Sequence, residues 1–230
     1  MKAAAYCGTR GVYRYMMPSI KSLLIHTKVD KVYLFIEDDL FPEYLPRQCE
    51  VVNVSGQRYF SPTGQNYAQW WTWMAMMKCA LTKLLPDLDR ILYLDIDTIV
   101  VKDLSKLWDL DLEDRYMAAV REPEKSVIKP YYNTGVVMFN LDKIRADGAD
   151  DILIRKLNKQ YYDFPDQDAM NEVFEGHVLD LQSAYNHAPA FMPSRQSPKV
   201  IHYAAMSKER WITKPRVKRY DSIPWEDITE

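Results

Sequence analysis

The chain has 230 residues, of which 47% are hydrophobic and 27% charged, with only seven glycines. This composition excludes a disordered or low-complexity chain, because it supplies enough apolar residues for a core and only a moderate charge content. Thirty basic residues against 32 acidic ones give a net charge near −2. The large positive excess typical of nucleic-acid-binding proteins is absent, so nucleic acid is not an expected partner.

Cysteine usage and the lengths of the apolar runs bear on location. Cys7, Cys49 and Cys79 are odd in number and far apart, which favours reduced thiols over a disulfide framework or a cysteine-bound metal. No apolar run is long enough to span a bilayer, and charges appear before any signal-peptide core. The expected location is the cytoplasm.

Short apolar runs along the chain predict six β-strands. They cover residues 2–7, 31–36, 50–54, 90–94, 116–120 and 135–141. Amphipathic segments between them predict two helices. One is expected from Pro18, a residue suited to a first helical turn, to residue 27. The other is expected over residues 67–85, where large apolar residues recur at three-to-four spacing: Trp70, Trp73, Met74, Met77, Leu81, Leu84 and Leu85.

The order of these elements predicts the fold class. Strand–helix–strand repeats with short connections are typical of an open α/β sheet whose strands are mostly parallel. The sequence contains no internal repeat, low-complexity tract or linker that would divide it. We therefore expect a single α/β domain over residues 1–230.

Two aspartates, Asp95 and Asp97, follow the fourth predicted strand. Ligands of open α/β sheets bind outside the carboxyl ends of strands, and side chains two residues apart in extended chain point the same way. Two neighbouring carboxylates repel, and a hard divalent cation relieves the repulsion while also binding phosphate oxygens. The pair therefore predicts a metal-assisted site for a nucleotide diphosphate. An ordinary turn, with one aspartate bonded to backbone amides, is the alternative.

The two interpretations differ in their consequences for stability. If repulsion dominates, replacing Asp95 or Asp97 by asparagine should leave the metal-free protein at least as stable as the parent. If the aspartates cap a turn, the same substitutions should cost about 0.5 to 2 kcal/mol.

Other nucleotide and hydrolase motifs are absent from the sequence. It contains no GxxxxGK[ST] phosphate loop, and CGTRG at residues 7–11 lacks the spacing of a dinucleotide fingerprint. It also contains no GxSxG, HExxH or paired CxxC motif. These absences argue against common NTPases, dehydrogenases, serine hydrolases and zinc proteases.

Four ordered segments resemble the motif blocks of family 8 glycosyltransferases, the group that includes glycogenin and the lipopolysaccharide galactosyltransferases. They are RILYLDIDTIVVKDLSKLWDLDL, YYNTGVVMFNLDKIR, PDQDAMNEVF and VIHYAAMSKERW, and the resemblance extends from the first strand to Trp211. It implies a GT-A fold, Rossmann-like, with a mixed sheet flanked by helices. It also implies a retaining transfer of a hexose, glucose or galactose, from a UDP-sugar with Mn²⁺ or Mg²⁺ bound.

The resemblance implies a metal site at Asp95, Asp97 and His202, with Ile96 beside the donor. Without the resemblance, His202, which follows an apolar pair, would be interpreted as a core residue. Lys208 matches the family's diphosphate-binding lysine, although Ala205 stands where a glycine is usual and KERW replaces the usual Lys-Pro-Trp. The diphosphate loop is therefore expected to differ in shape.

The same resemblance implies the catalytic and donor-binding residues. Asp166 and Gln167 match the acid–amide pair beside the anomeric carbon, where a plain helix N-terminus is the alternative. Lys78 matches a basic residue that touches the donor, where a surface lysine is the alternative. The remaining donor-binding positions are Tyr6, Thr9 and Tyr13 near uracil and ribose, and Asn133, Thr134 and Gly135 near the sugar.

Two other functions and the acceptor stay open. A sugar nucleotidyltransferase also uses metal-bound carboxylates but usually needs a glycine-rich phosphate loop, and a GT-A-fold binding module would have lost activity. The acceptor is a carbohydrate, a lipid-linked sugar or a protein. A basic, aromatic C-terminal tail, about residues 208–230, is compatible with contact with an anionic membrane surface, but an ordinary solvated terminal segment is the favoured alternative. The sequence does not indicate an oligomeric state.

Overall fold

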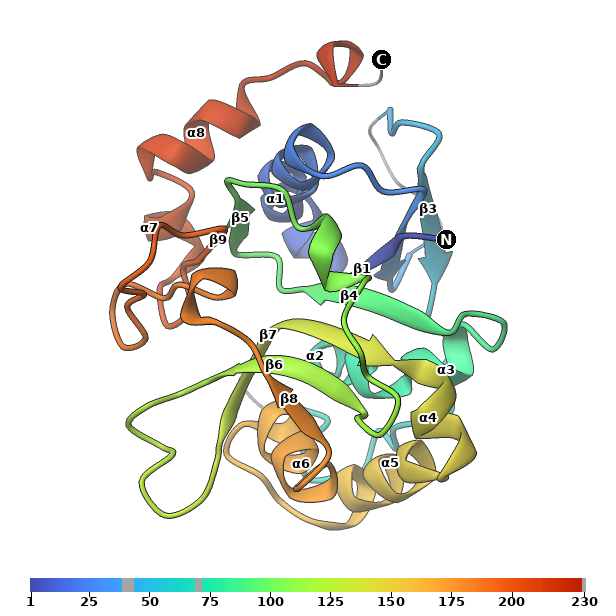
Figure 1. Ribbon diagram of the computed structural model, residues 1–230. Coiled ribbons are helices and arrows are strands. Elements are labelled where there is room, and N and C mark those ends of the chain that lie inside the picture. Colours follow the sequence, from blue (N-terminus) through green and yellow to red (C-terminus); the bar gives the residue numbers. More distant parts are fainter. Residues whose placement is uncertain (39–43, 69–71, 229–230) are drawn as a thin grey trace.

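The computed structural model describes residues 1–38, 44–68 and 72–228. Its centre is a mixed, seven-stranded sheet in the order β3-β2-β1-β4-β7-β6-β8 (Figure 1). These strands are β1 Ala3–Gly8, β2 Lys31–Ile36, β3 Cys49–Asn53, β4 Arg90–Leu94, β6 Met117–Arg121, β7 Tyr132–Asn140 and β8 Val178–Asp180. A second, two-stranded sheet pairs β5 Thr98–Val100 with β9 Val200–His202.

The pairing of the large sheet is mostly parallel. β1 runs parallel to β2 and β4, β2 runs parallel to β3, and β6 runs parallel to β8. β7 is antiparallel to both of its neighbours, β4 and β6. The predicted sheet class is confirmed, and all six predicted strands are present with ends shifted by at most a few residues. β5, β8 and β9, three residues each, were too short to give a pattern.

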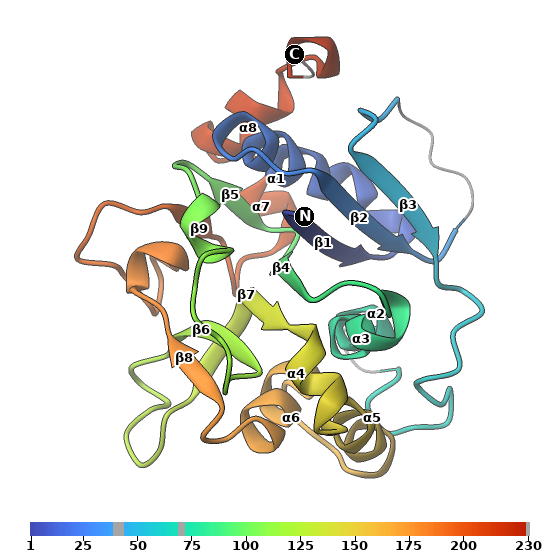
Figure 2. The same ribbon diagram turned by 45° about the vertical axis from the view of Figure 1, so that its right-hand side comes forward.

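Helices cover both faces of the large sheet (Figures 1 and 2). On one face lie α1 Tyr13–His26 and α8 Pro215–Asp221. On the other lie α2 Thr72–Met76, α3 Leu81–Leu84, α4 Leu141–Ala146, α5 Ala149–Lys159 and α6 Pro165–Val173. Alternate side chains of β1 enter the two apolar cores: Ala4 and Tyr6 join the core under α1, and Ala3, Ala5 and Cys7 join the opposite one.

Both predicted helices differ from the prediction. α1 begins at Tyr13, so the predicted start at Pro18 is wrong, and Pro18 lies inside the helix. A proline there removes one helical hydrogen bond, but the preceding turn buries Tyr15, Met16 and Met17 against the core. Burial of three large side chains outweighs the lost bond, since packing rather than propensity gives most helical stability in proteins.

The predicted helix over residues 67–85 is not continuous. Among the described residues, α2 and α3 are separated by a 3₁₀ segment, Met77–Ala80, and Trp70 lies outside the described residues. All four side chains of the 3₁₀ segment are buried. Lys78 belongs to this buried segment and is therefore directed into the protein rather than toward solvent.

The C-terminal segment is folded onto the α1 face rather than forming a separate tail. Its apolar side chains join the core beside α1, namely Trp211 of α7 (Lys208–Trp211), Val217, Tyr220 and Trp225. Among the residues that the structure describes, no helix combines the length and apolar character needed to cross a membrane.

The topology brings four chain segments together at the carboxyl end of β4. β7 runs antiparallel to β4, so its beginning meets the end of β4, and Asp95 N donates to Gly135 O at 2.8 Å. β5 follows the Asp95–Asp97 turn and pairs with β9, which places Thr98 opposite His202. The N-terminus of α6 adds Asp166 and Gln167.

Candidate active site

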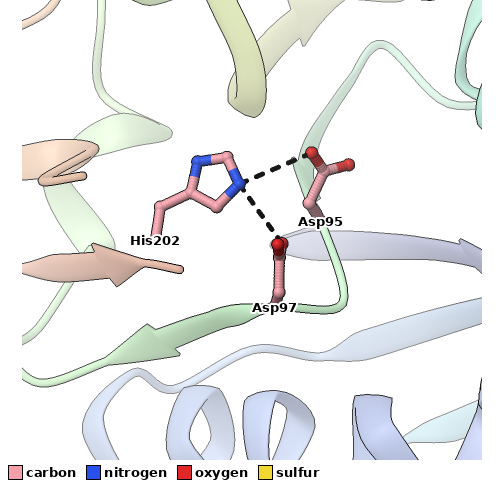
Figure 3. A group of neighbouring side chains, drawn as sticks. All are labelled: Asp95, Asp97 and His202. Atoms are coloured by element: carbon pink, nitrogen blue, oxygen red, sulfur yellow. Dashed lines mark ion pairs between the residues drawn. The ribbon is translucent and has the colours of Figure 1, made fainter. Parts of the chain in front are cut away.

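Asp95, Asp97 and His202 form a compact group at this edge of the sheet. His202 Nε2 lies 3.2 Å from Asp97 Oδ1 and 3.7 Å from Asp95 Oδ2 (Figure 3). One oxygen or nitrogen atom from each residue can be chosen so that all lie within 4.8 Å of one another. His202 is 3% exposed, whereas the aspartates are 31% and 20% exposed. Two partly accessible carboxylates and one buried imidazole fit a divalent cation with room for substrate phosphates.

Gly135 makes this approach possible. A Cβ atom at this position would lie 2.1 Å from His202 Cε1 and 2.9 Å from Asp95 Oδ2. Any other residue would therefore push the histidine and the aspartate apart. The expected role of Gly135 is to let backbone approach a sugar, and the structure adds a packing role beside His202 and Asp95.

The charges of the cluster support one another. Burial alone would lower the pKa of His202, but the neighbouring carboxylates of Asp97 and Asp95 outweigh it and raise that pKa above its usual value. Burial would likewise raise the pKa of Asp97, but the adjacent His202 outweighs it and the pKa is lowered. In the absence of a cation, the two carboxylates therefore favour the protonated form of the imidazole.

Lys78 occupies the other side of Asp95. Its Nζ lies 2.9 Å from Asp95 Oδ1 and 2.9 Å from Asp166 Oδ2, and it donates to Thr134 O at 3.2 Å. It also lies 4.4 Å from the centre of the Tyr93 ring, which favours a cation. Burial opposes the charge, but Asp166 and Asp95 outweigh burial and raise the pKa of Lys78. The alternative of a surface lysine is wrong, since the side chain is 3% exposed.

These contacts change the expected role of Lys78. The three N–H groups of its ammonium already have three acceptors. We conclude that Lys78 joins two carboxylates of the site rather than presenting a free cation to a diphosphate.

Asp166 and Gln167, the predicted catalytic pair, lie at the start of α6 and face the start of β7. Thr134 Oγ1 donates to Asp166 Oδ2 at 3.1 Å, and Thr134 N donates to Gln167 Oε1 at 3.1 Å. Through Lys78, Asp166 is one side chain away from Asp95. The structure therefore brings the second and third of the four sequence blocks to the carboxylate pair of the first. Asn133 and Thr134 are buried in this contact region.

Several predicted positions lie outside the cluster. Tyr6 is fully buried, and its hydroxyl accepts from Ser19, so its ring belongs to the core and does not offer a face to uracil. Thr9 and Tyr13, which follow β1, are partly buried, as is Ile96 between the aspartates. Lys208 is exposed at the start of α7, and within the described chain it makes no ion pair or hydrogen bond to the cluster.

The loop between His202 and Lys208 contains a strained residue. Ala205 has φ 62°, in the left-handed region that glycine adopts without steric cost. The sequence departs from the family pattern at this position, where a glycine is usual. The geometry that a glycine would favour is kept although the residue is an alanine.

The sequence analysis missed three further side chains. Tyr93 OH donates to Asp95 Oδ1 at 2.9 Å, and its position two residues before Asp95 on the same strand face was an available signal. Glu122 Oε1 accepts from Asn133 Nδ2 and Gln167 Nε2, and its place just after the predicted strand at residues 116–120 was also an available signal. Asn186 Oδ1 lies 2.9 Å from His202 Nδ1, and no pattern in the sequence indicates this contact.

Comparison with known proteins gives relatives along most of the chain. The model of glycosyl transferase family 8 matches residues 5–211. A lipopolysaccharide 1,2-glucosyltransferase of Escherichia coli (strain K12) is 33% identical over 175 residues, covering 61% of this chain and 51% of that protein. The glycosyltransferase GlyD of Streptococcus pneumoniae serotype 4 is 24% identical, covering 98% of this chain and 30% of that protein. The chain thus spans about half or less of these two relatives.

Solved structures share the fold. The glycosyltransferase GlyE of Streptococcus pneumoniae TIGR4 superposes with a TM-score of 0.74 at 21% identity, covering 99% of this chain and 62% of that one. The galactosyltransferase LgtC, solved with donor and acceptor sugar analogues, gives a TM-score of 0.67 at 20% identity and covers 98% of this chain and 99% of its own. The predicted GT-A fold is confirmed. With the family match over residues 5–211, the chain belongs to glycosyl transferase family 8.

Proposed function

We propose that this chain is a retaining, metal-dependent glycosyltransferase that moves a hexose, glucose or galactose, from a UDP-sugar to a carbohydrate acceptor. The observation that carries the proposal is the Asp95–Asp97–His202 group, whose candidate ligand atoms lie within 4.8 Å of one another. Lys78 connects this group directly to Asp166. A cation-binding edge and a carboxylate for the sugar thus lie on opposite sides of one buried lysine.

Asp95, Asp97 and His202 would hold Mn²⁺, or Mg²⁺ in its place. Mixed carboxylate and imidazole ligands suit Mn²⁺, and both ions bind the oxygens of substrate phosphates. Such an ion supplies positive charge next to the diphosphate that leaves when the sugar is transferred. The partial exposure of Asp95 and Asp97 leaves room for the diphosphate to approach.

The chain's own residues would act on the sugar. Cleavage of the sugar–phosphate bond builds positive charge at the anomeric carbon, which carboxylate and amide oxygens stabilise if they are held in place beforehand. Asp166 is held by Lys78 and Thr134, and Gln167 by the backbone of Thr134. We assign these two side chains to the anomeric carbon, with Asn133, Thr134 and Gly135 lining the sugar side.

The residues proposed to contact the nucleoside and the diphosphate are assigned from their positions alone. Thr9 and Tyr13, just after β1, would contact uracil and ribose. Lys208 would reach the diphosphate by movement of its loop. A lipid-linked sugar or a protein is the alternative acceptor. Contact with a membrane is also proposed, through the exposed basic side chains of α8, namely Arg216, Lys218 and Arg219.

The first experiment is a panel of nucleotide sugars with Mn²⁺, in which released UDP is measured with and without chelator. We expect UDP release from UDP-glucose or UDP-galactose only when metal is present, with Asp97→Asn as the inactive control. Pyrophosphate as the product would instead identify a nucleotidyltransferase. If no nucleotide sugar is turned over and none stabilises the protein, the result would support a binding module that has lost activity.

Two further measurements test the finer claims. UDP and Mn²⁺ together should raise the melting temperature more than either alone, since each supplies ligands for the other and binding stabilises the native state by mass action. Proton NMR of the product should show an α-linked sugar from an α-linked donor. A β-linked product would contradict the retaining assignment of Asp166 and Gln167.

A further inference from the structure

A line of buried hydrogen bonds connects His202 with Gln167. Asn186 Oδ1 lies 2.9 Å from His202 Nδ1, and Asn186 Nδ2 donates to Asn133 Oδ1 at 2.7 Å. Asn133 Nδ2 donates to Glu122 Oε1 at 2.8 Å, and Gln167 Nε2 donates to the same oxygen at 3.1 Å. All five side chains are buried, none more than 9% exposed. The line therefore links the candidate metal ligand to the candidate catalytic amide through buried side chains.

The direction of these hydrogen bonds follows from their end points. Glu122 can only accept from the two amide groups that reach its Oε1, so Asn133 must turn its Nδ2 toward Glu122. The backbone N–H of Gly135 donates to Asn133 Oδ1 at 3.0 Å, and a backbone N–H can only donate. Two independent partners thus fix Asn133 in the same orientation.

The orientation of Asn133 determines the rest of the line. With Asn133 Oδ1 as acceptor, Asn186 must present its Nδ2 on that side and its Oδ1 on the other. An amide oxygen can only accept, so His202 must carry a proton on Nδ1. The neutral imidazole then has its lone pair on Nε2, the nitrogen that faces Asp95 and Asp97 (Figure 3).

The other branch from Glu122 orients Gln167. Its Nε2 donates to Glu122 and to Tyr131 OH at 3.1 Å each, and its Oε1 accepts from Thr134 N at 3.1 Å. A reversed amide would place its nitrogen against the Thr134 N–H and its oxygen against Glu122. A donor would then face a donor, and an acceptor would face an acceptor. The same carboxylate therefore fixes the oxygen side of Gln167.

We propose that Glu122 and Asn186 are positioning residues that select the Nδ1–H tautomer of His202 and orient the Gln167 amide from one buried carboxylate. The inference rests on the proposed role of His202 as a metal ligand. Partners of this kind behind a metal-binding histidine fix its tautomer and ring orientation, and their loss typically costs 10- to 100-fold in metal affinity.

The first test reads the tautomer of His202 in the unaltered protein by ¹⁵N NMR of histidine-labelled material. Spectra are recorded at a pH where the ring is neutral, and again with Mg²⁺ and UDP. The molecule contains an internal reference, because Ser194 N donates to His187 Nδ1 at 2.7 Å and so requires the proton of neutral His187 on Nε2. We expect His202 and His187 to show opposite tautomers. A proton on Nε2 of His202 would overturn the proposal without any variant.

The second test measures Mn²⁺ affinity in the presence of UDP. Asn186→Leu should weaken binding about 10- to 100-fold and give a mixture of His202 tautomers. Glu122→Met should do the same in smaller measure, whereas Glu122→Gln, which keeps an acceptor oxygen, should retain most of the affinity. The matched control is Asn66→Leu. Asn66 is another buried asparagine, bonded to the Leu157 and Gln160 backbone, and its loss should leave Mn²⁺ affinity within twofold.

The outcomes separate the two claims. If the unaltered protein does not bind Mn²⁺ with UDP, the metal role of His202 is wrong and the inference falls with it. If the unaltered protein binds but Asn186→Leu binds equally well with an unchanged tautomer, only the positioning role is wrong. Should Asn186→Leu not fold, the Glu122→Met and Glu122→Gln pair decides: equal affinities in these two variants would overturn the proposal.

Discussion

The site has two sides that treat their carboxylates differently. On the Lys78 side, Asp95 is paired with a buried ammonium whose three N–H groups are all engaged within the protein. On the His202 side, Asp97 is paired with an imidazole, which can lose its proton and become neutral. The charge of Asp95 is therefore always balanced by Lys78, whereas His202 balances the charge of Asp97 only while the imidazole is protonated. If His202 is a metal ligand, as proposed, the His202 side is where a cation would replace a proton.

This comparison revises the stability expected from like-charge repulsion alone. Asp95 is paired with Lys78, and the imidazole of His202 lies against both Asp97 and Asp95, so we expect repulsion between the aspartates not to dominate the metal-free site. Removal of either charge leaves a partner behind, and the cost depends on how well that partner is solvated. We expect the two aspartates to behave differently, because Lys78 is always charged and His202 is not.

The largest effect should follow removal of the permanent cation. Lys78→Met leaves Asp95 and Asp166 facing each other without their shared partner. Breaking a buried ion pair by removing one member typically costs 3 to 5 kcal/mol, and we expect about 3 kcal/mol here because Asp95 is 31% exposed. Denaturant unfolding measures this loss. Lys156→Met, which breaks the exposed pair with Glu172, is the control and should cost less than about 1 kcal/mol. Equal losses in the two variants would contradict the structural role of Lys78.

A smaller contrast is expected between the two aspartate variants. In the presence of chelator, Asp95→Asn should lose about 1 to 2 kcal/mol, because Lys78 keeps Asp166 but loses a charged acceptor. Asp97→Asn should change stability by less than about 0.5 kcal/mol, since His202 can become neutral instead. Both variants should lose Mn²⁺-dependent UDP release. Thermal and denaturant unfolding of the metal-free proteins decide the matter, and an Asp95→Asn variant more stable than the parent would restore the repulsion model.

The two sides should also differ in their response to pH. The pKa of metal-free His202 is raised, because the charges of Asp97 and Asp95 outweigh burial. The stability contributed by its charge is therefore fully present below the unfolded pKa, near 6.5, and is lost as pH rises through the raised folded pKa. Mn²⁺ needs the unprotonated nitrogen, so its affinity should fall about tenfold, or 1.4 kcal/mol, per pH unit below that folded pKa.

Lys78 should contribute nothing to this pH profile, since its pKa is also raised and it stays charged. Calorimetric titration of Mn²⁺ at successive pH values, with UDP present, measures the slope. His202→Gln, which cannot take up a proton, is the control and should show a weak and nearly pH-independent affinity. A flat profile in the unaltered protein would mean that His202 is not a ligand.

The fold was largely predictable because strand patterns and chain order constrain an α/β sheet strongly. The six predicted strands all exist, and the Asp95–Asp97 turn lies at a strand end as expected. The helix boundaries were less predictable, because they depend on tertiary burial. The sequence pattern predicts a helix start at Pro18, but Tyr15 and Met16 pack on the core, and α1 begins earlier, at Tyr13. No local signal reports such packing.

The site was predictable from two sources. The place of Asp95 and Asp97 after a strand predicted the carboxylate pair, whereas His202 was predicted only by the resemblance of the ordered blocks to a known family, and the structure brings the three residues together. The partners of Lys78, Asp95 and Asp166, were not predictable, because a lysine in an amphipathic segment gives no local signal of burial against distant carboxylates. Asn186 lies in a segment without periodic pattern, and its contact with His202 arises because the next residue, His187, pairs with Ile201 of β9. Buried polar networks of this kind are specified by three-dimensional neighbours and leave little trace in sequence periodicity.

The smallest expected effect concerns the loop that leads from the His202 side to Lys208. Ala205 has φ 62°, and a side chain in this region costs about 1 kcal/mol relative to glycine. Ala205→Gly should therefore stabilise the protein by up to about 1 kcal/mol, reduced by the greater flexibility of glycine in the unfolded chain. Ala146→Gly, in the last turn of α4, is the matched control and should destabilise by about 0.5 to 1 kcal/mol. Unfolding in denaturant compares the two. The Ala205 substitution alters only the loop, so Mn²⁺ affinity should stay within twofold, whereas a large change in affinity would mean that the strained loop, and not the Asn186 contact, holds His202 in place.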